Sequence, residues 1–186
     1  VTDSWGDNDG TDNTSAGYTT DAAVGSYAKS FDGVDDVVPL GNNAIDPTRT
    51  NLSVSIWANK DDTSDATLVD LHSRVLIQFG DNVSSGFGGA IFDGSSWNTV
   101  SSGNTTTGSW LMLTMTWDGS TMEFYVNDTS QGTVSVSSSD NPGAPDAFGA
   151  KWDGSSSVEE YGGDLDDPRF YTKGLSSTEV SNLYNK

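Results

Sequence analysis

Short runs in which hydrophobic and polar residues alternate recur along the chain, separated by turns rich in Gly, Asn, Asp and Ser. The run NLSVSIWAN (51–59) alternates well, with Leu, Val, Ile and Ala on one face. The run SWLMLTMTWDGSTMEFYVND (109–128) alternates on both sides of Asp118-Gly119, and GGAIFDGSSWNTV (88–100) has the same form around Asp93-Gly94. An Asp-Gly pair between alternating runs is a strong hairpin signal. Many short strands joined by such turns predict an all-β sandwich or barrel.

The sequence predicts one helix, at the C-terminus. Ser176 and Glu179 form a capping box, and Val180, Leu183 and Tyr184 follow at helical spacing. The first 28 residues are polar with weak periodicity, and are either a tail or a loop-rich edge. A length of 186 residues suits one domain better than two, so we expect a single domain over 1–186.

The chain is strongly acidic, with 27 Asp and Glu against 8 Lys and Arg and a formal net charge of -19. Such a surface repels phosphates and anionic lipids, so nucleic acid and membrane are poor partners. Self-repulsion destabilises the compact state unless salt screens it. We therefore expect a protein adapted to high salt, with a Ca²⁺-rich extracellular module as the compatible second interpretation.

Other compositional features narrow the setting of the protein. The chain has no Cys, which excludes disulfides and thiol catalysis, and no apolar run approaches the roughly 20 residues that span a bilayer. We therefore expect no membrane insertion. Because the sequence starts at Val1, we expect a processed product or an excised domain of a larger protein.

A short motif of aromatic residue, Asp and Gly recurs four times, at 31–33, 92–94, 117–119 and 152–154, and the last three continue with Ser. The spacings are unequal, which excludes a solenoid or propeller period. Asp and Gly both tolerate positive φ, so we interpret the last three as repeated turn chemistry.

Two segments together resemble a known family. SFDGVDDVVPL (30–40) resembles the opening motif of LamG-like domains in the concanavalin A-like superfamily, and YGGDLDDPRFYTKGLSSTEVSNLY (161–184) resembles their closing strand and helix. The lead-in DSWGDNDGTDN (3–13) and the central alternating runs are also similar to this family. The resemblance implies a two-sheet antiparallel jelly-roll β-sandwich. It also implies a carbohydrate-binding or adhesion module of a larger extracellular protein, although some relatives are glycosidases or polysaccharide lyases.

Members of the family often carry a structural Ca²⁺ that ties the N-terminal segment to the last strand. Ca²⁺ binds six to eight hard oxygen ligands. Carried onto this sequence, the candidate ligands are Asp3, Asp32, the carbonyl of Gly33, and Asp166 with Asp164 as its neighbour. The alternative is that these residues are surface charge alone.

Strand alternation separates the three aspartates of GGDLDDPRFY (162–171). If Leu165 points into the core, Asp164 and Asp166 point outward and Asp167 points inward. Asp167 then has the alternatives of capping backbone amides or pairing with Arg169. Asp166 is therefore the predicted link to the N-terminal segment.

A glycan site needs an exposed aromatic platform with planar hydrogen-bonding groups beside it. Trp97 and Trp152 lie close to Gly/Ser turns and are candidate platforms, with Tyr161 as a third. The polar companions that we expect beside them are Arg74, Asp81, Asn82 and Asn98. The alternative is that the aromatic residues pack against loops.

Catalysis has little support in the sequence. The one His, His72, has no recognisable partner, and no strand carries the Glu-x-Asp-x-x-Glu pattern of glycosidases on this fold. Glu159 and Glu160 are adjacent and would point to opposite faces of a strand. We therefore predict no enzyme activity. The expected function is a non-catalytic, Ca²⁺-stabilised module that binds a glycan or cell-surface partner, on the surface of a halophilic cell or of a virus that infects one. The alternative is a structural or protein-interaction domain of a surface or virion protein.

Overall fold

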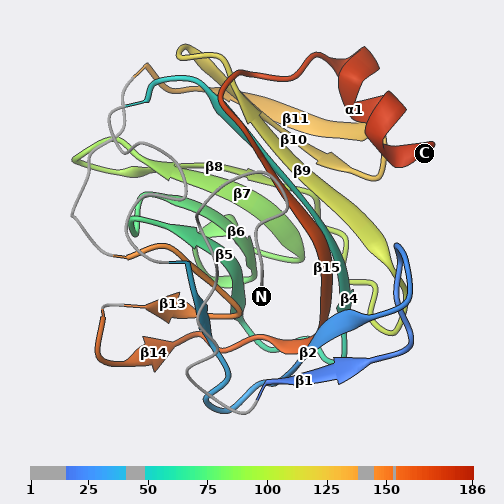
Figure 1. The fold of residues 1–186 in the computed structure, drawn as a ribbon. Coiled ribbons are helices and arrows are strands. Elements are labelled where there is room, and N and C mark those ends of the chain that lie inside the picture. The colour runs from blue at the N-terminus through green and yellow to red at the C-terminus, as the bar shows by residue number, and fades with distance from the viewer. Residues whose placement is uncertain (1–15, 41–48, 138–144, 153) are drawn as a thin grey trace.

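The computed structural model describes residues 16–40, 49–137, 145–152 and 154–186. Two antiparallel sheets lie face to face and enclose the core (Figure 1). The strand order is β1-β2-β15-β4-β9-β10-β11 in the seven-stranded sheet and β3-β12-β5-β6-β7-β8 in the six-stranded sheet. This architecture, with one short C-terminal helix, confirms the predicted all-β jelly-roll sandwich.

The strands are short, as the spacing of turns predicts. The seven-stranded sheet contains β1 (Gly17–Thr19), β2 (Ala28–Asp32), β15 (Gly162–Tyr171), β4 (Leu52–Lys60), β9 (Leu111–Trp117), β10 (Thr121–Val126) and β11 (Thr129–Ser135). The six-stranded sheet contains β3 (Val38–Pro39), β12 (Ala147–Phe148), β5 (Ala66–Leu71), β6 (Val75–Phe79), β7 (Phe87–Phe92) and β8 (Trp97–Ser101). The remaining elements are a small sheet of β13 (Lys151–Trp152) and β14 (Ser157–Val158), the 3₁₀-helix η1 (Asp81–Val83) and the helix α1 (Ser177–Tyr184).

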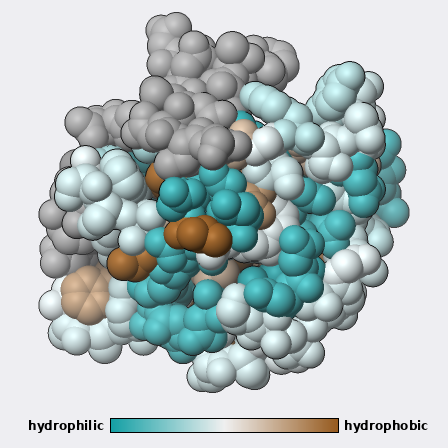
Figure 2. All heavy atoms as spheres, turned by 90° about the horizontal axis from the view of Figure 1, so that it is seen from below, coloured by the Kyte–Doolittle hydropathy of each residue, from teal (hydrophilic) through white to brown (hydrophobic). Residues whose placement is uncertain are grey.

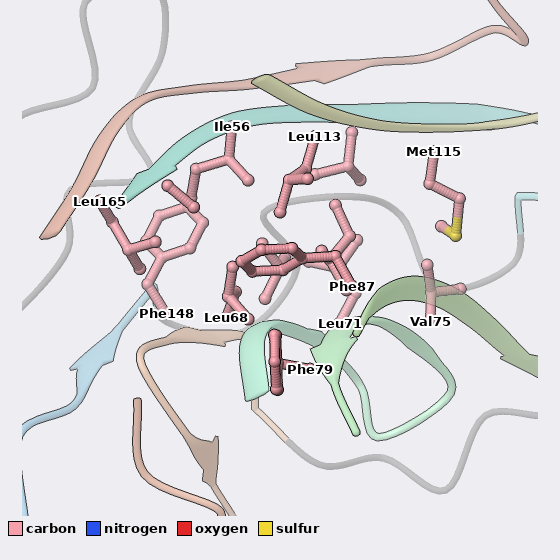
Figure 3. Close-up of a cluster of buried hydrophobic side chains, with 14 of the residues drawn as sticks. Ile56, Leu68, Leu71, Val75, Phe79, Phe87, Leu113, Met115, Phe148 and Leu165 are labelled. Carbon is pink, nitrogen blue, oxygen red and sulfur yellow. The ribbon is translucent and has the colours of Figure 1, made fainter. Parts of the chain in front are cut away.

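The core lies between the sheets and is built from the alternating faces that the sequence predicts. Figure 3 shows Ile56, Leu113 and Met115 of the seven-stranded sheet facing side chains of the six-stranded sheet such as Phe87 and Val75. Ile56 of β4 pairs with Leu113 of β9, and all five of these side chains are at most 1 % exposed. Burying each such side chain stabilises the fold by about 2 kcal/mol.

Helix α1 covers part of the outer face of the seven-stranded sheet (Figure 1). Its N-terminus has the predicted capping box, in which Ser176 accepts from the N–H of Glu179 and Glu179 accepts from that of Ser176. Val180 is fully buried, and Tyr184 stacks on Trp57 of β4 with ring centroids 5.7 Å apart. Of the helices in the described part of the chain, none is long and apolar enough to cross a membrane.

The recurrent aromatic-Asp-Gly motif builds turns in which the Asp carboxylate accepts backbone N–H groups. Asp93 Oδ1 accepts from the N–H groups of Ser95 and Ser96, both at 2.9 Å, in the β7–β8 hairpin. Asp118 does the same in the β9–β10 hairpin. The pKa of Asp93 is lowered by its hydrogen bond from Asn98 and by those from the backbone, and the pKa of Asp118 is lowered by its backbone hydrogen bonds. The interpretation as turn chemistry is confirmed for these two motifs, while Asp153 lies outside the described residues.

The polar N-terminal stretch is an edge of the sandwich where the structure describes it. Strand β1 pairs with β2, which pairs with β15, so β1 extends the edge of the seven-stranded sheet. Figure 2 views the molecule from below, the side on which Figure 1 places β1, β2, β13 and β14, and shows small separate hydrophobic areas among hydrophilic ones.

Candidate functional site

The outer face of the six-stranded sheet gathers polar side chains from segments far apart in the sequence. Glu159, beside β14, extends over β5 and β6, and its Oε2 accepts from Thr67 Oγ1 and from Gln78 Nε2, each at 2.8 Å. Lys151 Nζ of β13 donates to Glu159 Oε1 at 2.6 Å. We call the group of Thr67, Gln78, Asp81, Asn82, Lys151 and Glu159 the outer-face cluster.

The helix η1 closes the other side of the outer-face cluster. Asn82 Nδ2 donates to Gln78 Oε1 at 3.1 Å, and Asp81 Oδ2 lies 3.4 Å from Lys151 Nζ. Val83 is fully buried against Leu76 and Ala90, which anchors η1 on the sheet. The hydrogen bonds therefore tie η1 to the β13–β14 hairpin across the face of the sheet.

The backbone of the outer-face cluster adopts conformations that are unusual for residues other than glycine. Asp81 has φ 50 and Glu159 has φ 57, and Ser84 at the end of η1 has φ 69. Each such conformation costs about 1–3 kcal/mol and persists where the surroundings hold it, often at functional sites. At Asp81 and Glu159, the side-chain contacts with Thr67, Gln78 and Lys151 keep the residues in these conformations.

Trp97 and Trp152 lie on opposite sides of the outer-face cluster. Trp97 belongs to the edge strand β8 and packs half-buried on Leu76 and Ala90, with its ring centroid 5.3 Å from that of Phe92. Trp152 belongs to β13, which contacts β5 and β12, and packs half-buried against the cluster of Val37, Ala147 and Ala150. Each indole therefore keeps a solvent-exposed part, as a sugar platform requires.

Three residues that the sequence predicts as glycan contacts do not form part of a site with Trp97 and Trp152. Tyr161 is fully buried, edge to face with Phe31, and Arg74 is 1 % exposed, so neither can contact a sugar and both predictions are wrong. Asn98 donates to the Asp93 carboxylate at 2.9 Å and supports the hairpin turn. The burial of Tyr161 could not be predicted from the sequence, because the residue that it packs against, Phe31, is far away along the chain.

Two buried aspartates, Asp70 and Asp146, lie near each other at the turn between β5 and β6, and Asp70 is next to Trp152. Asp70 is fully buried and accepts from the N–H groups of Ser73 at 2.7 Å and of Trp152 at 3.3 Å. Burial raises the pKa of Asp70 to about 6. His72 is 4 % exposed and its Nε2 lies 3.4 Å from Asp146 Oδ1, so it has a partner that the sequence did not reveal. A buried, paired imidazole is poorly placed to act on a substrate in solvent.

An acidic cluster lies at the turn after β2. Asp32, Asp35 and Asp36 each offer one carboxylate oxygen, and these oxygens lie within 4.8 Å of one another. Asp36 is 4 % exposed, and its Oδ1 is buried with no hydrogen-bond partner among the described residues. An unpaired buried carboxylate oxygen is costly, and hard carboxylate oxygens are the ligands that Ca²⁺ prefers. The cluster therefore fits the ion that the family resemblance implies.

The acidic cluster includes only part of the predicted set of Ca²⁺ ligands. Asp32 is in the cluster and Gly33 follows it with φ 74, while the sequence missed Asp35 and Asp36, although both stand in the quoted motif SFDGVDDVVPL. Asp164 and Asp166 are not members of the cluster, and Asp3 lies outside the described residues.

Asp166 does link the last strand to the N-terminal segment, but through direct hydrogen bonds. Its carboxylate accepts from the N–H groups of Val24 at 2.7 Å and Asp167 at 2.8 Å, with Ala23 as a third donor. Burial raises the pKa of Asp166 and of Asp164, which accepts from Ser30. In the structure the Asp166 carboxylate contacts backbone amides directly, and its role as a metal ligand stays a prediction.

Asp167 takes the second of its predicted roles. Arg169 donates to it from Nε at 3.0 Å and from its terminal nitrogen at 2.7 Å. The register of β15 against β4 shifts between Asp166 and Arg169, and Asp167 has φ 45. This bulge interrupts the alternation on which its predicted inward orientation depended.

Comparisons with known proteins agree with this fold. A family model described as the concanavalin A-like lectin/glucanases superfamily matches residues 32–181. The sequence comparison with curated proteins gave no match.

Among solved structures, one similar to this chain is domain 4 of AbnA, a GH43 extracellular arabinanase from Geobacillus stearothermophilus, in complex with arabinotriose. It has a TM-score of 0.73 at 18% identity, over 92% of this chain and 82% of that one. The SAP-like pentraxin of Limulus polyphemus has a TM-score of 0.63 at 17% identity, over 83% and 80%. The binding domain of Paraclostridial Mosquitocidal Protein 1 has a TM-score of 0.74 at 14% identity, over 96% of this chain and 47% of that one. At these identities the likeness shows a shared fold.

Proposed function

Because the chain belongs to the concanavalin A-like lectin/glucanases superfamily, we propose that it is a non-catalytic carbohydrate-binding module whose site is the outer-face cluster between Trp97 and Trp152. The observation that carries this proposal is the convergence of the Asn82 amide, two carboxylates and the Lys151 ammonium between two half-exposed indoles. The buried Thr67 and Gln78 hold these groups in place from below and do not themselves reach a ligand. Sugar hydroxyls exchange hydrogen bonds with such groups, and the C–H face of a sugar ring packs on an indole. The similar arabinanase domain, which was solved with arabinotriose, supports the same class of ligand.

The charge of the site favours neutral glycans. Asp81 and Glu159 outnumber the one cation of the outer-face cluster, Lys151, and the whole chain carries a formal charge of -19. Uronates and sulfated sugars would meet like charge, which costs binding energy. We therefore expect neutral glycans to bind and anionic glycans to be rejected.

A glycan array in molar salt tests the proposal. We expect Trp97→Ala and Trp152→Ala each to weaken binding by about tenfold, the usual effect of removing an aromatic anchor. The matched control is Trp110→Ala, because the Trp110 indole lies elsewhere and donates to Asp21 at 3.2 Å. No binding to any glycan, or equal losses in all three variants, would refute the proposal.

We also propose that Ca²⁺ binds at Asp32, Asp35 and Asp36 and stabilises the turn after β2. The buried, unpaired Oδ1 of Asp36 supports this proposal. We expect EDTA to lower the melting temperature at constant ionic strength, and Asp36→Asn to remove most of that response. A melting curve that neither EDTA nor Asp36→Asn changes would refute the calcium site.

The acidic composition supports a proposed location on an extracellular surface in high salt, within a larger surface or virion protein. A purely structural or protein-interaction role in such a protein is the second candidate. The exposed hydrophobic side chains of the β1–β2 region favour it, since Tyr18 is 66% and Tyr27 65% exposed. Retained binding to a cell or protein partner without binding to any glycan would support this second candidate.

A further inference from the structure

A cavity of about 290 Å³ opens at the edge of the sandwich where β1 and β2 extend the seven-stranded sheet. Its apolar wall is part of the main core and includes Phe31, Val38, Ile56, Phe148 and Leu165. Figure 3 shows Ile56, Phe148 and Leu165 together at one end of the core. Ligand pockets for drug-sized molecules occupy roughly 300–1,000 Å³, so this cavity suits one bulky group better than an oligosaccharide.

The strand register explains why the cavity reaches the surface. Tyr18 of β1 pairs with Lys29 of β2, and Lys29 pairs with Leu165 of β15, so these three side chains lie on the same, core-facing side of the sheet. Tyr18 and Tyr27 line the cavity and remain 66% and 65% exposed. They therefore form an aromatic mouth over an apolar interior.

Exposed hydrophobic side chains are concentrated in the segment that contains β1 and β2, and two of them, Tyr18 and Tyr27, line the cavity. Among the described residues, four of the five exposed large hydrophobic side chains lie between residues 18 and 34, and only Val158 lies elsewhere. Exposed apolar groups beside a cavity are typical of an interaction site rather than of random surface composition.

The polar groups around the mouth already have partners within the chain. Asp166 accepts backbone N–H groups, Asp167 forms an ion pair with Arg169, and Lys29 donates to the carbonyl of Ala16 at 2.5 Å. A ligand therefore gains little from new hydrogen bonds to side chains here. Its affinity must therefore come from apolar and aromatic contact and from hydrogen bonds to backbone groups.

Strand β1 indicates the kind of ligand. Within the described part of the chain it is the edge strand of its sheet, and an edge strand presents N–H and C=O groups to which an extended segment can pair. A residue opposite Tyr18 on such an added strand would carry its side chain on the cavity side. The formal net charge of -19 on the whole chain favours a basic segment.

From the register, the apolar cavity and the edge strand, we propose that this site docks a basic, extended polypeptide segment. The segment pairs with β1 and inserts one bulky apolar side chain into the cavity between Tyr18 and Tyr27. This proposal does not rest on glycan binding at the outer-face cluster.

Peptide binding tests the proposal. The probe is a short peptide of alternating Lys and Thr with a central Trp, and its binding to the full chain is measured by titration calorimetry or tryptophan fluorescence. We expect Tyr18→Ser and Tyr27→Ser each to weaken binding by about tenfold. The matched control is Val158→Ser, which removes an exposed hydrophobic side chain at β14 and should leave peptide binding unchanged.

Matched peptides separate the parts of the proposal. We expect replacing the central Trp with Ala, methylating alternate backbone nitrogens, or replacing Lys with Glu each to abolish measurable binding. Equal binding of the methylated peptide, or of N-acetyltryptophanamide alone, would overturn strand pairing and with it the proposal. Binding that survives Tyr18→Ser combined with Tyr27→Ser in a folded protein, verified by circular dichroism, would also overturn it.

Discussion

The contact between Asp166 and the N-terminal segment gives the sharpest test of how this fold is held together. Its carboxylate accepts backbone N–H groups from Val24 at 2.7 Å and Asp167 at 2.8 Å. A hydrogen bond to a charged group contributes about 1.5–3 kcal/mol, and a half-buried carboxylate loses part of this to water. We therefore expect Asp166→Ala to lower the free energy of unfolding by about 3 kcal/mol.

The corresponding change in melting temperature is large enough to measure. For a domain of this size, 1 kcal/mol corresponds to roughly 2–4 °C, so Asp166→Ala should melt about 10 °C lower. Asp166→Asn keeps an acceptor oxygen and should lose about a third as much. The matched control is Asp164→Ala, on the same strand, whose side chain accepts from Ser30 rather than from the N-terminal loop.

Thermal unfolding followed by circular dichroism, with calcium and with EDTA at constant ionic strength, distinguishes the two accounts of Asp166. If direct hydrogen bonds hold the loop, the loss in Asp166→Ala is the same with and without calcium. A loss that occurs only with calcium would make Asp166 a metal ligand and refute the reasoning, and so would an unchanged melting temperature in both conditions.

Three further expectations concern pH, backbone geometry and salt. The pKa of Asp70 is raised to about 6, so its contribution to stability is present below about pH 4 and is lost as the pH rises to about 6. Denaturant titrations should show Asp70→Asn gaining on the wild type by on the order of 3 kcal/mol between pH 4 and pH 7, and parallel pH curves would contradict this. Gly149 has φ 85 and a Cβ there would lie 2.3 Å from a ring carbon of Phe31, so Gly149→Ala should cost about 3 kcal/mol or more in a denaturant titration, whereas Gly25→Ala, which meets nothing within 4 Å, should cost about 1 kcal/mol. The melting temperature should rise with NaCl concentration because salt screens a formal charge of -19, and a flat curve would count against high-salt adaptation.

Local patterns in the sequence predicted most of the fold. Alternation in 51–59 and 109–128 identified the sides of β4 and β9 that face the other sheet, because each strand carries its own period, although the opposite side of β9 is buried as well. The capping box at Ser176 identified the start of α1 for the same reason. These features depend on neighbours within a few residues, which a single sequence displays.

The candidate sites were predicted less completely, because they depend on contacts between distant segments. Tyr161 was a candidate platform from the sequence, but in the structure it is buried against Phe31, more than a hundred residues earlier. The partner of His72 is Asp146, which is also distant along the chain. The bulge in β15 moved Asp167 out of the predicted alternation. Asp35 and Asp36 were visible in the sequence, and only the unpaired oxygen of Asp36 distinguishes them from surface charge.

The aspartate turns also limit how this surface can change its charge. At Asp93 and Asp118 the carboxylate accepts hydrogen bonds from backbone N–H groups of the turn. The same group that carries the negative charge therefore also stabilises the hairpin. Only four of the 27 acidic residues are Glu, whose longer side chain does not fit this short local bond as well. A redesign for low salt would therefore have two classes of aspartate to treat differently. Those in turns tolerate Asn, which keeps the acceptor, while the free ones can be exchanged for Lys or Ser.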